Sequence, residues 1–190
     1  MSVLNDYYLS ELDLTLVRDF ILDNGEWAVY PRNTFFIRQH ERGKKVGFIE
    51  DGLFRYTRSD SSGKEHLVGY SLANDFVGEY TSCLCNRESL VNIQAVKVAR
   101  VCCLPYSKLE EFWNSSEEKQ HLGRLVAEQL FVMTYRRLMD RYCCTPEERY
   151  RDLMNRYPNL KELLPLREIA SFIGVTPETI SHIRRKIREE

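Results

Sequence analysis

The sequence predicts an α+β protein with an N-terminal antiparallel β-roll, a long helix and a C-terminal pair of short helices. Three observations carry this prediction. Short runs rich in β-branched and aromatic residues alternate with turn residues between Trp27 and Pro105. A helical period free of proline extends from Ser116 to about Tyr142. After Pro165, two amphipathic segments are separated by a glycine.

The first element is predicted as a helix from about Asp6 to Asp23. Ser10 is placed to cap it, and Asp13 stands three residues further on, as in a capping box. The residues expected on its apolar face are Leu9, Leu12, Leu16 and Phe20.

Seven short runs are expected to form strands. They are Trp27–Tyr30, Thr34–Arg38, Val46–Glu50, Leu53–Ser59, His66–Ser71, Asn92–Val96 and Arg100–Pro105. Two of the turns between them, Asp51-Gly52 and Ser62-Gly63, look like tight hairpin turns, because glycine adopts a positive φ without steric cost. Many short strands with frequent turns indicate a compact antiparallel roll, barrel or sandwich.

Helical spacing returns with a short helix from Ser107 to about Trp113 and a long one from Ser116 to about Tyr142. The long helix is apolar on more than one face, so we expect it to contact its own β domain and a second copy of itself. The alternative is a helix buried inside a monomer. The residues predicted at the homodimer interface are Leu122, Val126, Gln129 and Met133.

These elements divide the chain into three parts. Residues 1–115 form the β-roll, residues 116–144 form the long helix and a hinge, and residues 145–190 form the C-terminal domain. A further short helix is expected over Pro146–Tyr157 because Pro158 stops it.

The C-terminal domain has the pattern of a helix-turn-helix. Leu166–Ile173 reads as one helix, and Gly174 supplies its C-terminal stop. Thr176 is a suitable N-cap for a second helix, with Pro177 at the first helical position and Glu178 in the first turn. Helix, glycine turn and capped helix together predict this motif.

The exposed face of the second helix carries groups that read base edges in a major groove, flanked by cations that neutralise phosphates. The residues predicted to contact DNA are Thr176, Glu178, Ser181, His182, Arg184, Arg185, Lys186 and Arg188. Residues 136–190 hold 12 Lys/Arg and 9 Asp/Glu, against 15 and 19 in residues 1–135, so a polyanion is expected to meet the C-terminal part. The alternative is a solvated basic helix that contacts no partner.

Two segments resemble the CRP/FNR superfamily, the relatives of the catabolite activator protein. They are VGFIEDGLFRYTRSDSSGKEHLVGYSLANDFVGEY (46–80) and REIASFIGVTPETISHIRRKI (167–187). A third segment, residues 149–170, is similar to Bacteroidetes-like members. The resemblance covers nearly the whole chain. It implies a double-stranded β-roll of the cyclic nucleotide-binding type, a dimerisation helix, and a transcription regulator that binds a palindromic DNA operator as a homodimer, with RNA polymerase as a further partner.

The resemblance also locates a candidate effector pocket. Family members that bind cyclic nucleotides carry a Gly-Glu pair, matched here by Gly78-Glu79, and an Arg-Ser pair about ten residues later, where this chain has Ser89-Leu90. A buried phosphodiester needs a compensating cation, so cyclic AMP and cyclic GMP are not the expected effectors. Arg87 would substitute if it lies on a strand, but not if it lies on a loop. The candidate pocket residues are Gly78, Glu79, Arg87, Ser89 and Thr134, with an unidentified small molecule as effector.

Other functional classes find little support. The six cysteines lack the spacing of zinc or iron–sulfur ligands, and no nucleophile elbow, H-E-x-x-H motif or phosphate-binding glycine loop is present, so no metal, no cofactor and no enzymatic activity are predicted. The alternative to a regulator is a cupin-like or cyclic-nucleotide-domain binding or signalling module whose tail does not act on DNA. The N-terminal residues lack the features of a secretory signal, and no apolar run is long enough to span a bilayer, which predicts a cytoplasmic protein without a membrane partner.

Overall fold

The computed structural model describes residues 12–157 and 160–189. Contacts within the chain separate two compact units, the first ending at Leu130 and the second beginning at Phe131. The division therefore falls inside the long helix. Each half of that helix packs with the elements of its own unit.

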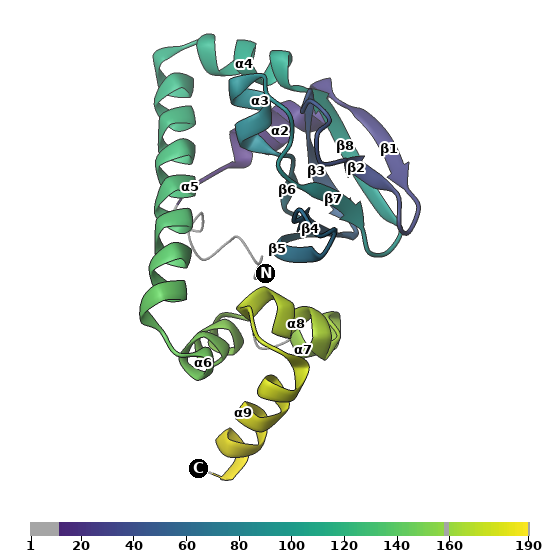
Figure 1. Cartoon of the computed structure of the whole chain (residues 1–190). Helices are drawn as coiled ribbons and strands as arrows, with labels where there is room; N and C mark the ends of the chain where they lie inside the picture. The colour runs from purple at the N-terminus through teal and green to yellow at the C-terminus, as the bar shows by residue number, and fades with distance from the viewer. Residues whose placement is uncertain (1–11, 158–159, 190) are drawn as a thin grey trace. The chain divides into compact units, whose positions relative to one another are not determined.

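Eight strands in the described part of the chain form the β-roll (Figure 1). They are β1 (Glu26–Tyr30), β2 (Phe35–Ile37), β3 (Lys45–Asp51), β4 (Leu53–Ser59), β5 (Glu65–Leu72), β6 (Phe76–Val77), β7 (Asn92–Ala95) and β8 (Ala99–Pro105). They make two four-stranded sheets with the orders β1-β8-β3-β6 and β2-β7-β4-β5, and their pairings are antiparallel. The predicted roll and seven of its strands are confirmed, and only β6 was not anticipated.

The core of the roll contains side chains from both sheets. Phe54 and Ile93 come from one sheet and Ile49 and Val101 from the other, and none of the four is accessible to solvent. Complete burial of one such side chain stabilises the folded state by about 1.5–3 kcal/mol, so the two sheets are held together mainly by this apolar layer.

The chain passes from one sheet to the other at Asp51-Gly52, and the prediction of a hairpin at this position is wrong. β3 pairs with β6 and β8, while β4 pairs with β5 and β7. Gly52 is nevertheless required, because its φ is +135° and a Cβ would overlap the Cβ of Ala99. The glycine therefore serves a close crossing between sheets, a role that a local turn pattern does not distinguish from a hairpin.

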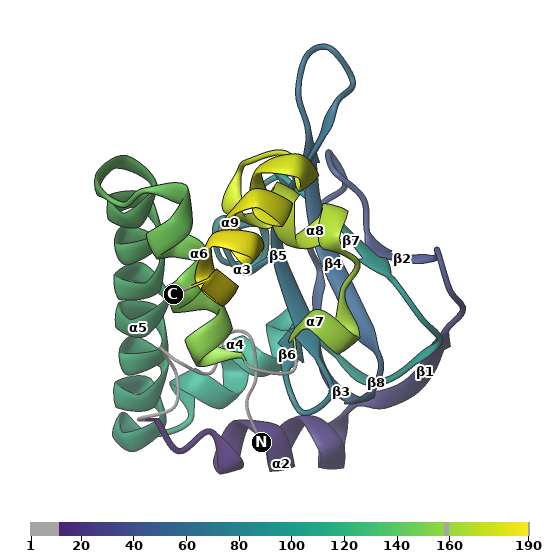
Figure 2. The same ribbon diagram turned by 90° about the horizontal axis from the view of Figure 1, so that it is seen from below.

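The second predicted turn, Ser62-Gly63, is confirmed as a hairpin that joins β4 to β5 and extends away from the rest of the roll (Figure 2). Asp60 organises it by accepting hydrogen bonds from the backbone N–H groups of Ser62 (2.9 Å) and Lys64 (3.1 Å). Hydrogen bonds from Ser62 and His66 hold the pKa of Asp60 well below its usual range.

The N-terminal helix differs from the expectation. Helix α2 spans Thr15–Asn24 and buries Val17 and Ile21, while Leu16 is 51% exposed. The predicted apolar face was wrong at Leu16 because the helix begins after Leu14 and presents its other side to β3 and β8. Ser10 and Leu9 lie outside the described residues.

Three further helices begin in the first unit: α3 (Tyr80–Cys85), α4 (Tyr106–Asn114) and α5 (Glu117–Cys143). Of these, α5 continues into the second unit. The short α3 was not predicted, whereas α4 and α5 match their expected positions within one residue. Gly123 does not interrupt α5, and it lets the helix approach the Trp113 ring closely.

The second unit contains α6 (Pro146–Arg156), α7 (Leu160–Leu163), α8 (Leu166–Ile173) and α9 (Pro177–Glu189). Helix α6 begins with a capping box in which Thr145 and Glu148 exchange hydrogen bonds. The bounds of α8 and α9 are those predicted from the sequence, and only α7 was missed.

Candidate functional site

Helices α8 and α9 form a compact two-helix core. Ile169, Ala170 and Ile180 are inaccessible to solvent, and Ile173 and Ile183 are nearly so. Between the helices, Gly174 adopts the left-handed conformation and its N–H caps the end of α8. The Thr176 hydroxyl accepts a hydrogen bond from the N–H of Thr179 (3.3 Å), as expected for an N-cap. The predicted helix-turn-helix geometry is therefore present.

The opposite face of α9 is open to solvent. The exposed side chains on or beside it are Glu178, Ser181, His182, Arg185, Lys186 and Arg188. Hydrogen bonds from its own backbone N–H and from Thr176 hold the pKa of Glu178 below its usual value, so this carboxylate is an ionised acceptor at neutral pH. One helix face thus presents an acceptor, a hydroxyl, an imidazole and guanidinium groups together.

Two of the predicted DNA-contacting cations already have partners on α6. Arg184 donates a hydrogen bond from Nε to the hydroxyl of the buried Tyr150 (2.8 Å), and Lys186 forms an ion pair with Glu147 (2.7 Å). Arg184 therefore helps to fix α9 on α6, whereas Lys186 remains largely exposed. The sequence pattern gave no indication of either partner, because both lie more than 30 residues away along the chain.

The end of α5 is attached to the helix-turn-helix by two arginines. The Arg137 guanidinium lies over the Phe172 ring, 5.6 Å from its centroid, and the Arg141 guanidinium lies against Gly174. Helix α6 is held to the same end of α5, since Arg149 donates to the carbonyl groups of Asp140 and Cys144. The second half of α5 therefore belongs structurally to the helix-turn-helix.

Helix α5 has no buried side chain, although it is rich in apolar residues. Among the predicted interface residues, Val126, Gln129 and Met133 are partly exposed, while Leu122 packs against the core of its own β-roll. A second stripe, which sequence reasoning did not single out, is more exposed and consists of Phe131, Tyr135, Leu138 and Tyr142. Its spacing of four, three and four residues places it on the face opposite the predicted stripe.

The predicted effector-pocket residues are not all available for a ligand. The Ser89 side chain is buried, and its hydroxyl exchanges hydrogen bonds with the carbonyl and N–H groups of Val91. The Glu79 carboxylate caps α3 by accepting from the N–H of Ser82 (2.6 Å) and from the Thr81 hydroxyl. Arg87 lies on a loop, which is the alternative under which it is not expected to share a strand face with Ser89.

The two remaining candidates have different surroundings. The N–H of Gly78 donates to the hydroxyl of Tyr56 (3.4 Å), and burial raises the pKa of Tyr56 to about 12. Gly78 therefore helps to fix the backbone that leads into α3. Thr134 lies in the second unit, on α5, and its role in an effector site stays a prediction.

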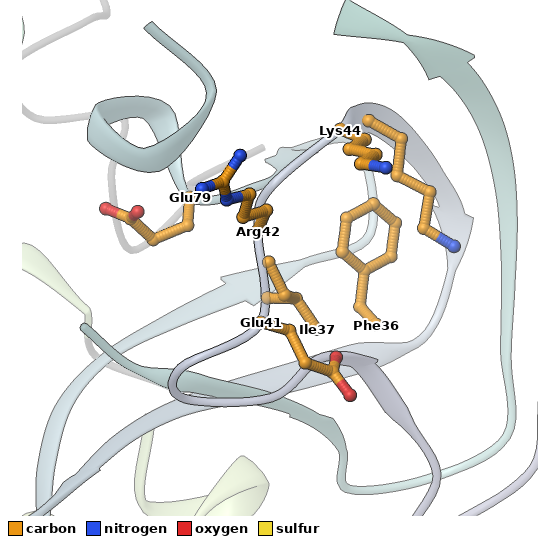
Figure 3. Close-up of a pocket in the computed structure, with 7 residues that line it drawn as sticks. Phe36, Ile37, Glu41, Arg42, Lys44 and Glu79 are labelled. Atoms are coloured by element: carbon orange, nitrogen blue, oxygen red, sulfur yellow. The ribbon is translucent and has the colours of Figure 1, made fainter. Parts of the chain in front are cut away.

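A pocket of about 200 Å³ opens beside Glu79, between β2 and the segment that leads into β3 (Figure 3). Its lining residues are Phe36, Ile37, Glu41, Arg42, Lys44, Lys45 and Glu79. Glu79 is the only predicted candidate among them. Sequence reasoning missed the others, although the run Arg42-Gly43-Lys44-Lys45, which concentrates three cations around one glycine, was a visible indication.

The cysteines do not form a cluster of metal ligands. Within the described ranges, no group of three or more His, Cys, Asp or Glu side chains is placed to hold a metal ion, and the cysteines are free thiols. Burial, reinforced by the Glu79 carboxylate, raises the pKa of the Cys83 thiol to about 11, which keeps it protonated at neutral pH. No described helix is long and apolar enough to cross a membrane.

This fold resembles that of known proteins. Residues 27–116 match the cyclic nucleotide-binding domain family. No curated protein sequence matches the chain significantly. Among solved structures, FixK2 from Bradyrhizobium japonicum is 16% identical with a TM-score of 0.71, over 87% of this chain and 85% of that one.

Two further structures have the same arrangement. The c-di-GMP-responsive global regulator CLP of Xanthomonas campestris is 15% identical with a TM-score of 0.67, over 93% of this chain and 92% of its own. The catabolite activator protein of Thermus thermophilus is 20% identical with a TM-score of 0.53, over 96% and 86%. Residues 27–116 therefore match the cyclic nucleotide-binding domain family, and the chain shares its fold with these three structures, as the resemblance indicated by the sequence implies.

Proposed function

We propose that this protein is a homodimeric transcription regulator that binds a palindromic DNA operator through α9 and responds to a small effector in the β-roll. The observation that carries the proposal is the exposed face of α9, which presents Glu178, Ser181, His182 and Arg185 on a capped, well-packed helix. The regulators with the same fold support it. We place its action in the cytoplasm, with RNA polymerase as a further partner.

Arg185 is the residue we assign to base recognition. It lies centrally on the exposed face, and a guanidinium pairs bidentately with O6 and N7 of guanine. Glu178, ionised at the start of α9, is suited to accept a hydrogen bond from a cytosine amino group. Lys186 and Arg188 flank this strip and are assigned to phosphates, which position the helix without reading sequence.

Dimerisation follows from the unburied apolar side chains of α5. In water, a 27-residue helix that carries apolar side chains on more than one face and buries none of them is stabilised by a second apolar surface, and a twin helix provides one by symmetry. A two-fold dimer presents two α9 helices, so the operator is expected to contain two half-sites separated by about 34 Å, one turn of DNA.

The effector is proposed to be a small molecule other than cyclic AMP or cyclic GMP. Ser89 occupies the position of the family's phosphate-binding arginine, and its hydroxyl is already used by Val91. Calorimetric titration with cyclic AMP is therefore expected to give weak binding or none, and micromolar affinity would contradict this part of the proposal.

A gel-shift experiment with the full chain and a selected operator distinguishes recognition of bases from non-specific attraction to phosphates. Arg185→Ala is expected to weaken binding by about 1–3 kcal/mol per half-site and to relax preference at one base pair. Lys186→Ala is the matched control, since it removes one cation from the same helix and is expected to weaken all sequences alike.

The competing function is a binding or signalling module whose tail does not act on DNA. It predicts that the wild-type protein shifts no DNA, or shifts it without sequence preference and equally in both variants. Either result would overturn the proposal.

A further inference from the structure

The pocket beside Glu79 contains more positive charge than the protein itself neutralises. The two carboxylates in its wall are engaged with donors other than the pocket cations: Glu41 accepts from the N–H of Arg38 (2.9 Å), and Glu79 caps α3. Arg42 and Lys44 are exposed, and within the described residues neither side chain has a hydrogen-bond or ion-pair partner. Two unpaired cations thus line one cavity.

The third cation of the pocket belongs to its structure. Lys45 donates a hydrogen bond to the Tyr30 hydroxyl (2.8 Å) and lies 4.8 Å from the centroid of the Phe36 ring. Phe36 and Ile37 supply the apolar part of the wall and are themselves buried in the roll. The pocket lining therefore combines Phe36 and Ile37 with Lys44, which lies beside the Phe36 ring, and Arg42, which lies on the side of Glu79 (Figure 3).

The segment that carries the two cations is anchored at both ends. His40 donates from its backbone N–H to Ser89 (2.9 Å), Ser89 donates back to Glu41 (2.7 Å), and Arg42 forms a β-bridge with Glu88. On the other side, the carbonyl of Lys44 accepts from the N–H of Tyr106 (2.8 Å).

Gly43 closes this segment onto α3. A Cβ at this position would overlap the Ser82 hydroxyl and lie 3.1 Å from the sulfur of Cys83. Only glycine fits here without a shift, so the backbone that carries Arg42 and Lys44 is pre-organised rather than free to follow any ligand. The Glu88 carboxylate, on the residue that bridges to Arg42, lies 3.5 Å from Nδ1 of His40.

We propose that this pocket binds a small phosphate monoester, with Arg42 and Lys44 holding the phosphate and Phe36 and Ile37 covering an attached apolar group. The inference rests on the proposed effector-responsive function and specifies its ligand. At pH 7 a phosphate monoester carries a charge of about −1.5 to −2 and three terminal oxygens that two cations can share, whereas a cyclic phosphodiester has a single charge and two such oxygens. Arginine adds a planar fork that pairs with two phosphate oxygens.

The experiment is a calorimetric titration of the full chain with phenyl phosphate, compared with phenol and with inorganic phosphate. Phenol retains the ring without the charge, and inorganic phosphate retains the charge without the ring. Saturable binding of phenyl phosphate is expected, with phenol and inorganic phosphate each at least about tenfold weaker.

Three variants assign the effect to the named residues. Arg42→Gln/Lys44→Gln is expected to reduce phenyl phosphate affinity by about tenfold or more, and the charge-preserving Arg42→Lys/Lys44→Arg to retain most of it. Lys97→Gln is the matched control, because this exposed lysine pairs with Asp51 at the far end of β3 from the pocket. Thermal unfolding should show that each variant is folded, because the substituted side chains are exposed.

The proposal is overturned if the wild type shows no saturable binding, if phenol binds as tightly as phenyl phosphate, or if the double glutamine variant binds unchanged. No DNA is present in the titration. A negative result would therefore remove the phosphate ligand and leave the Arg185 test of DNA binding unaffected, and a failure of DNA binding would leave the titration interpretable.

Discussion

The β-roll and the helix-turn-helix are held together by contacts of different range. In the roll, Trp27 pairs with Cys102 and Val46 with Leu104, residues far apart in the sequence. In the helix-turn-helix, the cap and the core lie within about twenty residues, and the N–H of Val175 bonds to the carbonyl of Ala170. A fold built from long-range pairs brings distant segments to one pocket, whereas a fold built from local contacts presents one helix face.

This difference bears on function. The pocket beside Glu79 combines β2, the segment before β3 and the residue that caps α3. The face proposed to contact DNA is instead a property of α9 alone, with α8 and α6 fixing its position. Changes in the core of one unit are therefore expected to leave the other intact.

The largest expected effect comes from a charge in the helix-turn-helix core. Ile180 is fully buried between α8 and α9, so Ile180→Asp leaves an uncompensated charge that costs about 3–5 kcal/mol. Hydrogen exchange should show α8 and α9 losing protection, with loss of DNA binding, while the strands retain theirs. Loss of protection in the strands as well would show that the two units unfold as one.

The corresponding change in the roll is Gly52→Ala. A positive φ and the overlap with Ala99 predict a loss of about 2–4 kcal/mol in the free energy of unfolding of the roll, measured in urea. Gly63→Ala is the matched control, since its φ is +81° but its surroundings are open, and it should cost only about 1 kcal/mol. Equal losses would contradict the close crossing at Gly52.

Helix α5 links the two regions, and its dimer seam is tested by Val126→Asp. Because Val126 is predicted near the two-fold axis, the carboxylate is expected to weaken the dimer at least about tenfold and give monomers in sedimentation at tens of micromolar. Tyr135→Asp changes the opposite face and should leave the dimer intact. A monomeric wild type, or a dimer broken by Tyr135→Asp alone, would refute the predicted seam.

A smaller effect is expected from Glu147→Gln. Glu147 pairs with Lys186, and this ion pair lowers the pKa of the Glu147 carboxyl, so the carboxylate is charged at neutral pH and competes with DNA for the lysine. Its removal should raise DNA affinity a few-fold and steepen the salt dependence by about one unit. In Lys186→Ala the same substitution should have no effect, and a gain that persists there would disprove this competition.

The same contrast in contact range explains what could be predicted from the sequence. The bounds of α8 and α9 follow from Gly174, Thr176 and Pro177, which lie beside the helices they delimit. The turn at Gly52 was misassigned because which sheet a strand joins depends on partners elsewhere in the chain. The cavity cations were missed for the same reason, since the fold alone places Arg42 beside Glu79.

The central claim is tested most directly by selecting binding sites from random DNA with the wild type and with Arg185→Ala. The account predicts an inverted repeat for the wild type, with half-sites about one helical turn apart, and loss of preference at one base pair per half-site in the variant. A selection that recovers no inverted repeat, or an Arg185→Ala protein with unchanged affinity and preference, would contradict it.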